Sequence, residues 1–224
     1  KIFANEQAAA AEIEELHVEI GILAWWPYII PKSVIASAKH GFINTHNSYL
    51  PNNRGKHPYY WAVVEECEYG VTLHWVDEGI DTGDIILQRG YHISEKDNYK
   101  TLLERAYLDC AVILYDALLM FKEGHVKAQK QIEVHPLGFY CTQRKIGDEI
   151  LNWNQTSREI FNFVRAICEP GPCARAFVNK KEMKINKVEL IHSSPNCQSI
   201  VGSIVDKTLN NFTVKTNDGV IKVT

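Results

Sequence analysis

No stretch of this chain approaches the roughly 20 consecutive apolar residues that a membrane-spanning helix requires, so the sequence predicts no membrane partner. No secretory signal precedes the first predicted helix, although the chain begins with Lys1 rather than Met. The six cysteines include no Cys-x-x-Cys pair and lie within apolar or loop segments. We therefore expect free thiols, as in a protein of the reducing cytoplasm.

The chain also has little net charge. Its 24 Lys and Arg residues against 27 Asp and Glu residues give a formal charge of −3, and the pI is about 6.3. Nucleic-acid-binding domains usually carry a basic excess, so this balance argues against a nucleic-acid partner. Hydrophobic residues make up 46% and charged residues 23% of the sequence, which is typical of a soluble globular protein. The length suits one full domain and a small one.

An amide and an imidazole stand together in the segment GFINTHNSYLPNNRG, residues 41–55. Residues 42–46 have the pattern of a short strand, and side chains alternate between the two faces of a strand. Asn44 and His46 therefore share one face, whereas Ile43 and Thr45 share the other. An amide donor beside a titratable imidazole suits a carbonyl that becomes a tetrahedral oxyanion, and this chemistry needs no cysteine or serine nucleophile.

A second polar segment, GVTLHWVDEGIDTGDII at residues 70–86, follows the same alternation. Val71, Leu73 and Trp75 share one face of the predicted strand, whereas Thr72 and His74 share the other. The strand runs into a glycine-containing turn that holds several carboxylates, namely Asp77, Glu78, Asp81 and Asp84. We expect one of these carboxylates to reach the imidazole of the first segment and to set its tautomer and charge.

A metal site is the competing interpretation of these side chains, because two histidines and a carboxylate form a known ligand set. His46, His74 and Asp81 would supply it. The histidines come from separate strands and show neither His-x-His nor His-x-x-His spacing, which argues against a bound metal. We therefore predict no metal ion here, and we interpret His74 as a pocket-wall or core residue.

Together the two segments resemble the paired signatures of the folate-dependent formyltransferases, the family of glycinamide ribonucleotide, methionyl-tRNA and nucleotide-sugar formyltransferases. The family pattern is an Asn-x-His strand end, then Ser-x-Leu-Pro and Arg-Gly, followed by a Gly-x-Thr strand and an Asp-x-Gly turn. The matching positions are Asn44, His46, Ser48, Leu50, Pro51, Arg54, Gly55, Gly70, Thr72, His74, Asp81 and Gly83. The resemblance extends from about Ile22 to Gln88, and more weakly through Arg165.

The resemblance implies an α/β fold with a Rossmann-like formyltransferase catalytic domain over residues 1–134. A connection, a helix and a small β-rich C-terminal domain follow over residues 135–224. Family members normally carry further strand and helix units ahead of this segment. We therefore expect the catalytic domain to lack its first βα units.

Periodicity and turn residues place the individual elements. In the first domain the predicted helices cover residues 3–16, 31–39, 57–66 and 101–122. The predicted strands of that domain cover residues 18–26, 42–46, 70–76 and 84–93, the first of them a buried parallel strand. Capping boxes at Thr101–Glu104 and Thr156–Glu159 indicate two helix starts. Short strands are predicted beyond that last helix, at residues 174–179, 182–191, 199–206, 211–216 and 219–223.

The resemblance implies that Asn44, His46 and Asp81 are catalytic and that 10-formyltetrahydrofolate donates a formyl group to a neutral primary amine. Asn44 would donate to the oxyanion, as would a protonated His46. Asp81 would favour the charged form of His46 and receive, through water, the proton that the amine sheds.

The resemblance also implies two sets of binding residues. The folate pocket would be lined by one apolar segment and one turn, namely Trp25, Trp26, Pro27, Tyr28, Asp77, Glu78, Gly79 and Ile80. The acceptor would contact Ser48, Tyr49 and Arg54, with the guanidinium gripping a phosphate or carboxylate.

The segment SYLPNNRGKHPYYWAVVE most resembles the nucleotide-sugar branch of the family, and a short, neutral second domain also fits that branch. The resemblance therefore implies an amino sugar linked to dTDP, UDP or GDP as the acceptor, as in lipopolysaccharide O-antigen biosynthesis. A methionyl-tRNA acceptor is an alternative, because RKIGDEI and NFVRAI resemble the linker and helix of that branch. A non-catalytic folate-binding relative is another. Exposed β-edges in the tail suggest a homodimer.

Overall fold

The computed structural model describes residues 6–26, 28–193 and 197–224. The chain forms two compact units, each assembled from segments that are distant in the sequence. Unit 1 consists of Lys1–Pro58, Glu68–His92 and Arg105–Gln143, and unit 2 consists of Tyr59–Cys67, Ile93–Glu104 and Arg144–Thr224.

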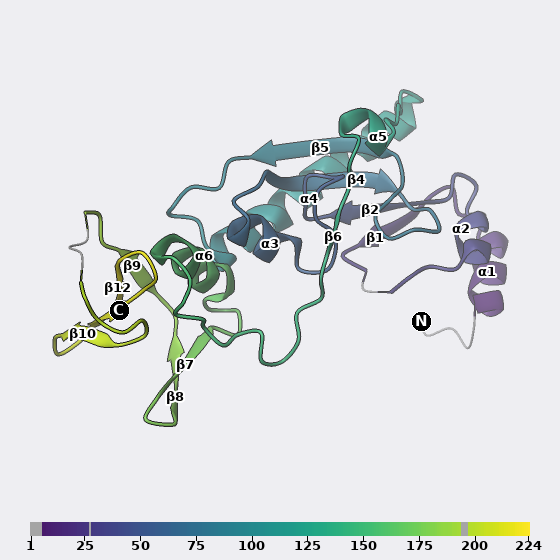
Figure 1. The fold of residues 1–224 in the computed structure, drawn as a ribbon. Helices are drawn as coiled ribbons and strands as arrows, with labels where there is room; N and C mark the ends of the chain where they lie inside the picture. Colours follow the sequence, from purple (N-terminus) through teal and green to yellow (C-terminus); the bar gives the residue numbers. More distant parts are fainter. Residues whose placement is uncertain (1–5, 27, 194–196) are drawn as a thin grey trace. The chain divides into compact units, whose positions relative to one another are not determined.

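Unit 1 contains a four-stranded mixed sheet with the strand order β1-β2-β4-β5 (Figure 1). Its strands are β1 (Gly21–Ala24), β2 (Phe42–His46), β4 (Tyr69–Trp75) and β5 (Ile85–Tyr91). Strands β1 and β2 are parallel, whereas β2, β4 and β5 are antiparallel to their neighbours. The predicted α/β fold with a separate β-rich C-terminal part is confirmed.

The long helix α4 (Tyr99–Glu123) covers one face of this sheet (Figure 1). The apolar side chains of the strands and the helix form one core, which includes Ile43, Val71, Leu73, Ile86, Ala106, Cys110, Ile113 and Ala117. Burying this apolar surface stabilises the packing by about 25 cal/mol per Å². Because strand side chains alternate, Asn44 and His46 of β2 and Thr72 and His74 of β4 lie on the opposite face of the sheet.

Strand β1 differs from its prediction in burial. It pairs in parallel with β2 as expected, but it stands at the end of the strand order among the described residues, and Ile22 is exposed. Helices α1 (Glu6–Glu15) and α2 (Lys32–Ala36) contribute to a second small core around Val34, Ala38 and Phe42. An apolar run therefore predicted the strand correctly but not its degree of burial.

Helix α4 begins earlier than the predicted capping box. The side chain of Asn98 accepts hydrogen bonds from the amides of Lys100 and Thr101, so Asn98 caps the helix. The hydroxyl of Thr101 in turn accepts from the Asn98 amide. The prediction of Thr101 as the cap is therefore wrong, because Thr101 occupies the third helical position of the box.

Three short elements complete unit 1: β3 (Arg54–Gly55), α5 (Gln131–Val134) and β6 (Tyr140–Cys141). Strand β3 pairs in parallel with β6. The backbone of Gln129 exchanges two hydrogen bonds of 2.8 Å with that of Ile85, the first residue of β5. This pair holds α5 beside the turn that precedes β5.

Unit 2 contains helices α3 (Pro58–Val64) and α6 (Ser157–Ile167) together with two antiparallel sheets. The predicted capping box of Thr156 and Glu159 is confirmed at the start of α6. One sheet has the order β10-β11-β12-β9, with β9 (Val188–Leu190), β10 (Ile204–Lys207), β11 (Phe212–Lys215) and β12 (Val220–Val223). The other is a hairpin of β7 (Ala174–Val178) and β8 (Lys181–Ile185), so the predicted strand 182–191 is two strands.

Two arginines of α6 bind the upstream segments of unit 2. The guanidinium of Arg165, only 7% exposed, donates to the carbonyls of Ser94 and Asp97 at 2.6 and 3.0 Å. Arg158 forms ion pairs with Glu66 and Glu95. These contacts connect the C-terminal part of the chain to residues 59–67 and 93–104.

The six cysteines are all free thiols, as predicted. None of the helices in the described part of the chain is long and apolar enough to cross a membrane.

Candidate active site

Four polar side chains converge on the face of the unit 1 sheet opposite α4. Asn44 and His46 come from β2, His74 comes from β4, and Asp81 comes from the turn before β5. Asn44 lies directly across from His74 in the β2–β4 register. The carboxylate of Asp81 lies 3.6 Å from Nδ1 of His46 and 3.5 Å from Nε2 of His74. The predicted convergence of Asn44, His46 and Asp81 is therefore present, and His74 belongs to the same group.

The tautomer of His74 follows from its backbone partner. Its Nδ1 lies 2.7 Å from the carbonyl oxygen of Trp75, which can only accept, so Nδ1 carries the proton. In the neutral ring Nε2 is then an acceptor, and the Asn44 amide nitrogen donates to it at 3.3 Å. The Asn44 amide keeps a second hydrogen for another acceptor. Its oxygen is buried and has no hydrogen-bond partner among the described residues.

His46 is held through its Nε2, whereas His74 is held through its Nδ1. Nε2 of His46 donates to the carbonyl of Asn53 at 3.0 Å, which leaves Nδ1 facing Asp81. Burial lowers the pKa of His46 below its ordinary value of 6.5, and the charge of Asp81 and the Asn53 carbonyl offset only part of this effect. The neutral ring with an unprotonated Nδ1 is therefore favoured, contrary to the expectation that Asp81 keeps His46 charged.

Asp81 is a buried carboxylate with several partners. Burial by itself would raise the pKa of Asp81, but the charges of His46 and His74 and the hydrogen bond from the Gly55 amide hold it well below its usual range. Asp81 thus remains ionised throughout the neutral range.

The loop that follows β2 is held by hydrogen bonds to β4 and β5. The hydroxyl of Thr72 donates to the carbonyl of Ser48 at 2.7 Å and accepts from the amide of Leu50 at 3.2 Å. Gln88 donates to Thr72 and to the Leu50 carbonyl. Ser48 is fully buried and its hydroxyl donates to the Asn52 carbonyl. The hydroxyl of Ser48 thus holds the loop, and the acceptor contact predicted for Ser48 stays a prediction.

Arg54 was predicted to bind the acceptor, but two of its three guanidinium nitrogens bind another residue. Its Nε and one terminal nitrogen donate to the side-chain oxygen of Gln131 at 3.0 and 2.6 Å. Its guanidinium lies 5.6 Å from the ring centre of Tyr140. The remaining terminal nitrogen is left for the predicted acceptor contact. The partly buried ring of Tyr49 packs close to Gly90, and its role in binding stays a prediction.

Gln131 was missed by sequence reasoning. It lies beyond both motifs and outside every predicted helix and strand, and its four-residue helix is too short to show a period. A buried glutamine in an otherwise exposed polar stretch gives no local signal. Only the contacts between distant segments reveal it.

The predicted folate-binding residues lie in two places in unit 1. Trp25 stacks on Tyr107 with ring centres 4.3 Å apart. Trp26 and Tyr28 are 51% and 73% exposed, and Pro27 lies outside the described residues. An exposed aromatic pair has the surface to receive a flat ring, so a role in folate binding stays a prediction for these residues.

The second predicted folate segment is the turn after β4. Asp77 accepts from the Gly79 amide and the Thr82 hydroxyl, at 3.0 and 2.6 Å, so its carboxylate stabilises the turn. Glu78 pairs with Lys32, and Ile80 is exposed. Among the described residues, no three His, Cys, Asp or Glu side chains form a group suited to a metal ion.

Two family patterns match the sequence. The family described as "Formyl transferase" matches residues 3–117, and "Formyl transferase, C-terminal domain" matches residues 145–224. The methionyl-tRNA formyltransferase of Thermodesulfovibrio yellowstonii is 33% identical over 214 residues, which cover 95% of this chain and 66% of that protein. That of Fusobacterium nucleatum is 34% identical over 212 residues, 93% of this chain and 66% of that protein. The chain thus spans just under two thirds of the length of these relatives.

Solved structures show the same fold. The N-formyltransferase from Helicobacter canadensis, in complex with folinic acid and dTDP-3-aminofucose, is 23% identical with a TM-score of 0.73, covering 94% of this chain and 76% of that one. HypX from Aquifex aeolicus, in complex with tetrahydrofolic acid, is 19% identical with a TM-score of 0.70, covering 98% and 37%. At these identities the similarity concerns the fold.

Proposed function

We propose, since the chain belongs to the formyl transferase family, that it transfers a formyl group from 10-formyltetrahydrofolate to a primary amine. The observation that carries this proposal is the group of Asn44, His46 and Asp81, joined through His74 by contacts of 3.3 to 3.6 Å. An amide donor, a neutral imidazole and a carboxylate supply what formyl transfer between two nitrogens requires.

The reaction forms one carbon–nitrogen bond and breaks another. The amine nitrogen attacks the formyl carbon, whose oxygen becomes an oxyanion, and the bond from that carbon to N10 of the folate then breaks. The free hydrogen of the Asn44 amide is suited to stabilise the oxyanion, an interaction that typically contributes about 10²–10³-fold in turnover. The proton lost by the amine is returned to N10, so that the products are the formamide and tetrahydrofolate.

His46 fits the role of base in this scheme rather than that of an oxyanion donor. Burial keeps its ring neutral, and Nδ1 carries a lone pair because Nε2 donates to Asn53. A proton that reaches Nδ1 lies 3.6 Å from the carboxylate of Asp81, which stabilises the resulting imidazolium. Asp81 then acts by charge and orientation.

For the acceptor, we propose methionyl-tRNA, the alternative left open by the sequence. The similar curated proteins are methionyl-tRNA formyltransferases that align over more than nine tenths of this chain.

The charge distribution along the chain also supports this acceptor, because the small net charge combines an acidic part and a basic part. Residues 144–224 hold 12 Lys and Arg against 8 Asp and Glu, a formal charge of +4, whereas residues 1–143 have a formal charge of −7. The C-terminal part thus has the basic excess expected of a nucleic-acid partner.

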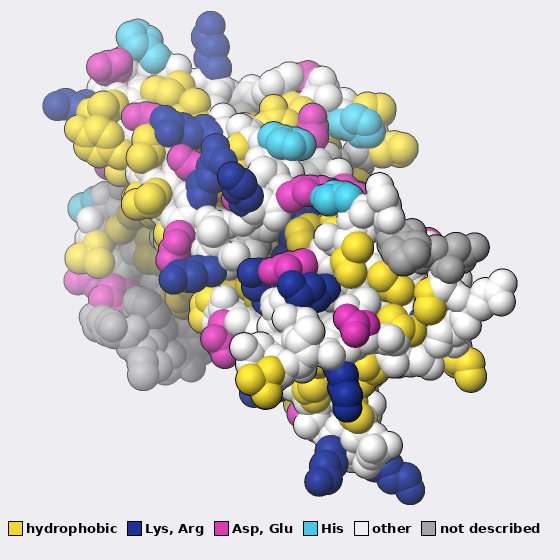
Figure 2. Space-filling model, turned by 90° about the vertical axis from the view of Figure 1, so that its left-hand side faces the viewer, with side chains coloured by type: hydrophobic (Ala, Val, Ile, Leu, Met, Phe, Trp, Pro, Cys, Tyr) yellow, Lys and Arg dark blue, Asp and Glu magenta, His cyan; other side chains and the backbone are white. Residues whose placement is uncertain are grey.

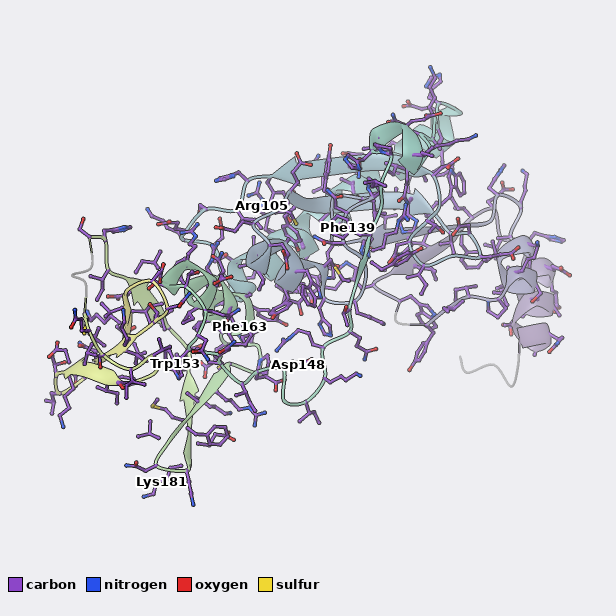
Figure 3. The ribbon with its side chains drawn as sticks, viewed as in Figure 1. Arg105, Phe139, Asp148, Trp153, Phe163 and Lys181 are labelled. Carbon is purple, nitrogen blue, oxygen red and sulfur yellow. The ribbon has the colours of Figure 1, made fainter. Side chains whose placement is uncertain are left out.

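Part of this positive charge gathers on the β7–β8 hairpin. Lys180, Lys181 and Lys184 are exposed and form no ion pair with the described residues. Figure 3 shows Lys181 at the tip of the hairpin, and Figure 2 shows Lys or Arg side chains (dark blue) at the same lower end. Phe177 is exposed on the neighbouring strand. Lysines with an exposed aromatic ring suit contact with phosphates and unstacked bases.

A nucleotide-linked amino sugar remains the second candidate acceptor. It is favoured by the fold shared with the Helicobacter canadensis enzyme, whose structure contains dTDP-3-aminofucose. The remaining guanidinium nitrogen of Arg54 suits the phosphate of either acceptor.

The test is to incubate the protein with 10-formyltetrahydrofolate and, separately, with methionyl-tRNA and with dTDP-, UDP- and GDP-linked amino sugars, and to detect formylated product by mass spectrometry. We expect a formyl group on methionyl-tRNA. Asn44→Ala should lower turnover by roughly 10²-fold, and the exposed Asn210→Ala should leave it unchanged. Formylation of a sugar alone would contradict the proposal that methionyl-tRNA is the acceptor. Folate binding without formylation of any acceptor would contradict the proposed formyltransferase activity.

A further inference from the structure

The shortest helix of the described residues, α5, is built around a polar side chain. Of its four residues only Gln131 is buried, with 4% of its surface exposed, while Ile132 is exposed. Helices normally bury apolar side chains. A helical turn that instead buries a glutamine requires an explanation in the contacts of that glutamine.

Gln131 uses its full hydrogen-bonding capacity. Its side-chain nitrogen donates to the carbonyls of Asp81 and Gly83, both at 2.8 Å. Its side-chain oxygen accepts two hydrogen bonds from the Arg54 guanidinium. Carbonyls require a donor and a guanidinium requires an acceptor, so these partners also fix the orientation of the amide.

The turn that Gln131 binds has an unfavourable backbone. Asp81 has φ +54°, in the left-handed region that costs a non-glycine residue about 1 kcal/mol or more. Gly83 lies so close to Trp75 that a Cβ would stand 1.9 Å from the Trp75 carbonyl oxygen. A strained turn persists only where surrounding contacts stabilise it. Here the side chain of Gln131 binds two carbonyls of the turn, those of Asp81 and Gly83.

The opposite side of Asp81 is held through the same glutamine. The Gly55 amide donates to the Asp81 carboxylate at 2.9 Å, and Gly55 directly follows Arg54. The backbone of Arg54 is fixed by a hydrogen bond to the Phe139 carbonyl, and its side chain by Gln131. Gln131 therefore connects the backbone of Asp81 with the strand whose amide binds the Asp81 carboxylate.

We propose that Gln131 is the positioning residue of the site, which holds Asp81 where its carboxylate meets His46 and His74. The proposal rests on the proposed formyl transfer for its functional meaning. Gln131 touches no reacting atom and acts through Asp81. Loss of its two donor hydrogens should let the turn relax and should move the carboxylate away from both imidazoles.

The test measures Asp81 through His46, independently of activity. Nuclear magnetic resonance of labelled histidine gives the pKa of His46 in the wild type, Gln131→Met, Gln131→Glu, Asp81→Asn and Gln129→Ala. Asp81→Asn removes the carboxylate charge and should lower this pKa by about one pH unit. Gln131→Met should lower it by at least half as much. The exposed Gln129→Ala, a matched control two residues away, should not change it.

Gln131→Glu separates the two halves of the contact. It keeps acceptors for Arg54 but has no hydrogens for the carbonyls of Asp81 and Gly83, so it should behave as Gln131→Met does. If the formyl transfer assay is positive, both variants should lose roughly 10-fold or more in kcat, with a much smaller change in KM for the folate.

An unchanged His46 pKa in a folded Gln131→Met, with the expected shift in Asp81→Asn, would overturn the positioning role. If Asp81→Asn itself left the pKa unchanged, the coupling on which the role depends would be absent. Failure of the proposed function is a distinct result, because a chain that formylates no acceptor still reports the pKa of His46.

Discussion

His46 and His74 present opposite ring nitrogens to Asp81. The Asn53 carbonyl takes Nε2 of His46, and the Trp75 carbonyl takes Nδ1 of His74, so each ring is left with its other nitrogen toward the carboxylate. In the neutral rings those nitrogens are acceptors. In the proposed formyl transfer, the proton shed by the amine thus meets a group of three acceptors.

Burial of His46 should make stability depend on pH. The unfolded residue takes up a proton near pH 6.5, whereas the folded residue does so only at lower pH. The unfolded state therefore binds more protons in this window, and the free energy of unfolding falls as the pH decreases from about 7 to 5, by at most about 1.4 kcal/mol per pH unit for one proton.

Urea denaturation of the wild type and of His46→Gln at pH 7 and pH 5.5 measures this effect. The substitution removes the titrating group, so it should reduce the loss of stability at the lower pH. His92→Gln, at an exposed histidine, should retain the loss. An equal loss in wild type and His46→Gln would contradict a depressed pKa in the folded state.

Helices and strands with a clear period could be predicted from the sequence, and those fixed by distant contacts could not. Strand β2 was predicted at its observed bounds, and the alternation of side chains between the two faces of a strand placed Asn44 and His46 on one face. Helix α5 could not be predicted, because its position depends on the backbone pair of Gln129 with Ile85. The burial of β1 was misjudged because an apolar run does not report its neighbours.

The start of α4 is a testable case at the same scale. Asn98→Ala removes the acceptor of two backbone amides and should lower the free energy of unfolding by about 1 kcal/mol. Asn98→Asp keeps an acceptor and serves as the matched control with little loss. Thermal or urea unfolding provides the measurement. A larger loss in Thr101→Ala than in Asn98→Ala would instead support Thr101 as the cap.

At the scale of the whole molecule, charge is distributed unevenly along the chain, and the net charge does not show this. The formal charge of −3 argued against a nucleic-acid partner, although it combines −7 in residues 1–143 with +4 in residues 144–224. Counting charge by domain would have revealed the basic part from the sequence. That the lysines of the hairpin are exposed could be established only from the structure.

For the proposed methionyl-tRNA acceptor, we expect the hairpin lysines to govern the salt dependence of binding. Replacing Lys180, Lys181 and Lys184 by Gln should weaken binding and reduce the slope of log affinity against log salt by about 1 for each phosphate that a lysine no longer neutralises. A matched triple change at exposed lysines of the acidic part, Lys96, Lys122 and Lys127, is the control. Fluorescence anisotropy at several salt concentrations gives both slopes. Equal slopes in the two triple variants would reject the hairpin as a tRNA-binding element.

The contacts of α6 with upstream segments limit where the chain can be cut into pieces that fold independently. Arg165 finds its acceptors in Ser94 and Asp97, and Arg158 finds its partners in Glu66 and Glu95. A gene fragment that starts after residue 143 would encode a nearly buried guanidinium deprived of both carbonyls, which is a costly state. Exchange of residues 144–224 between homologues, in the laboratory or by recombination, should therefore give a folded protein only when residues 59–67 and 93–104 are exchanged together with them.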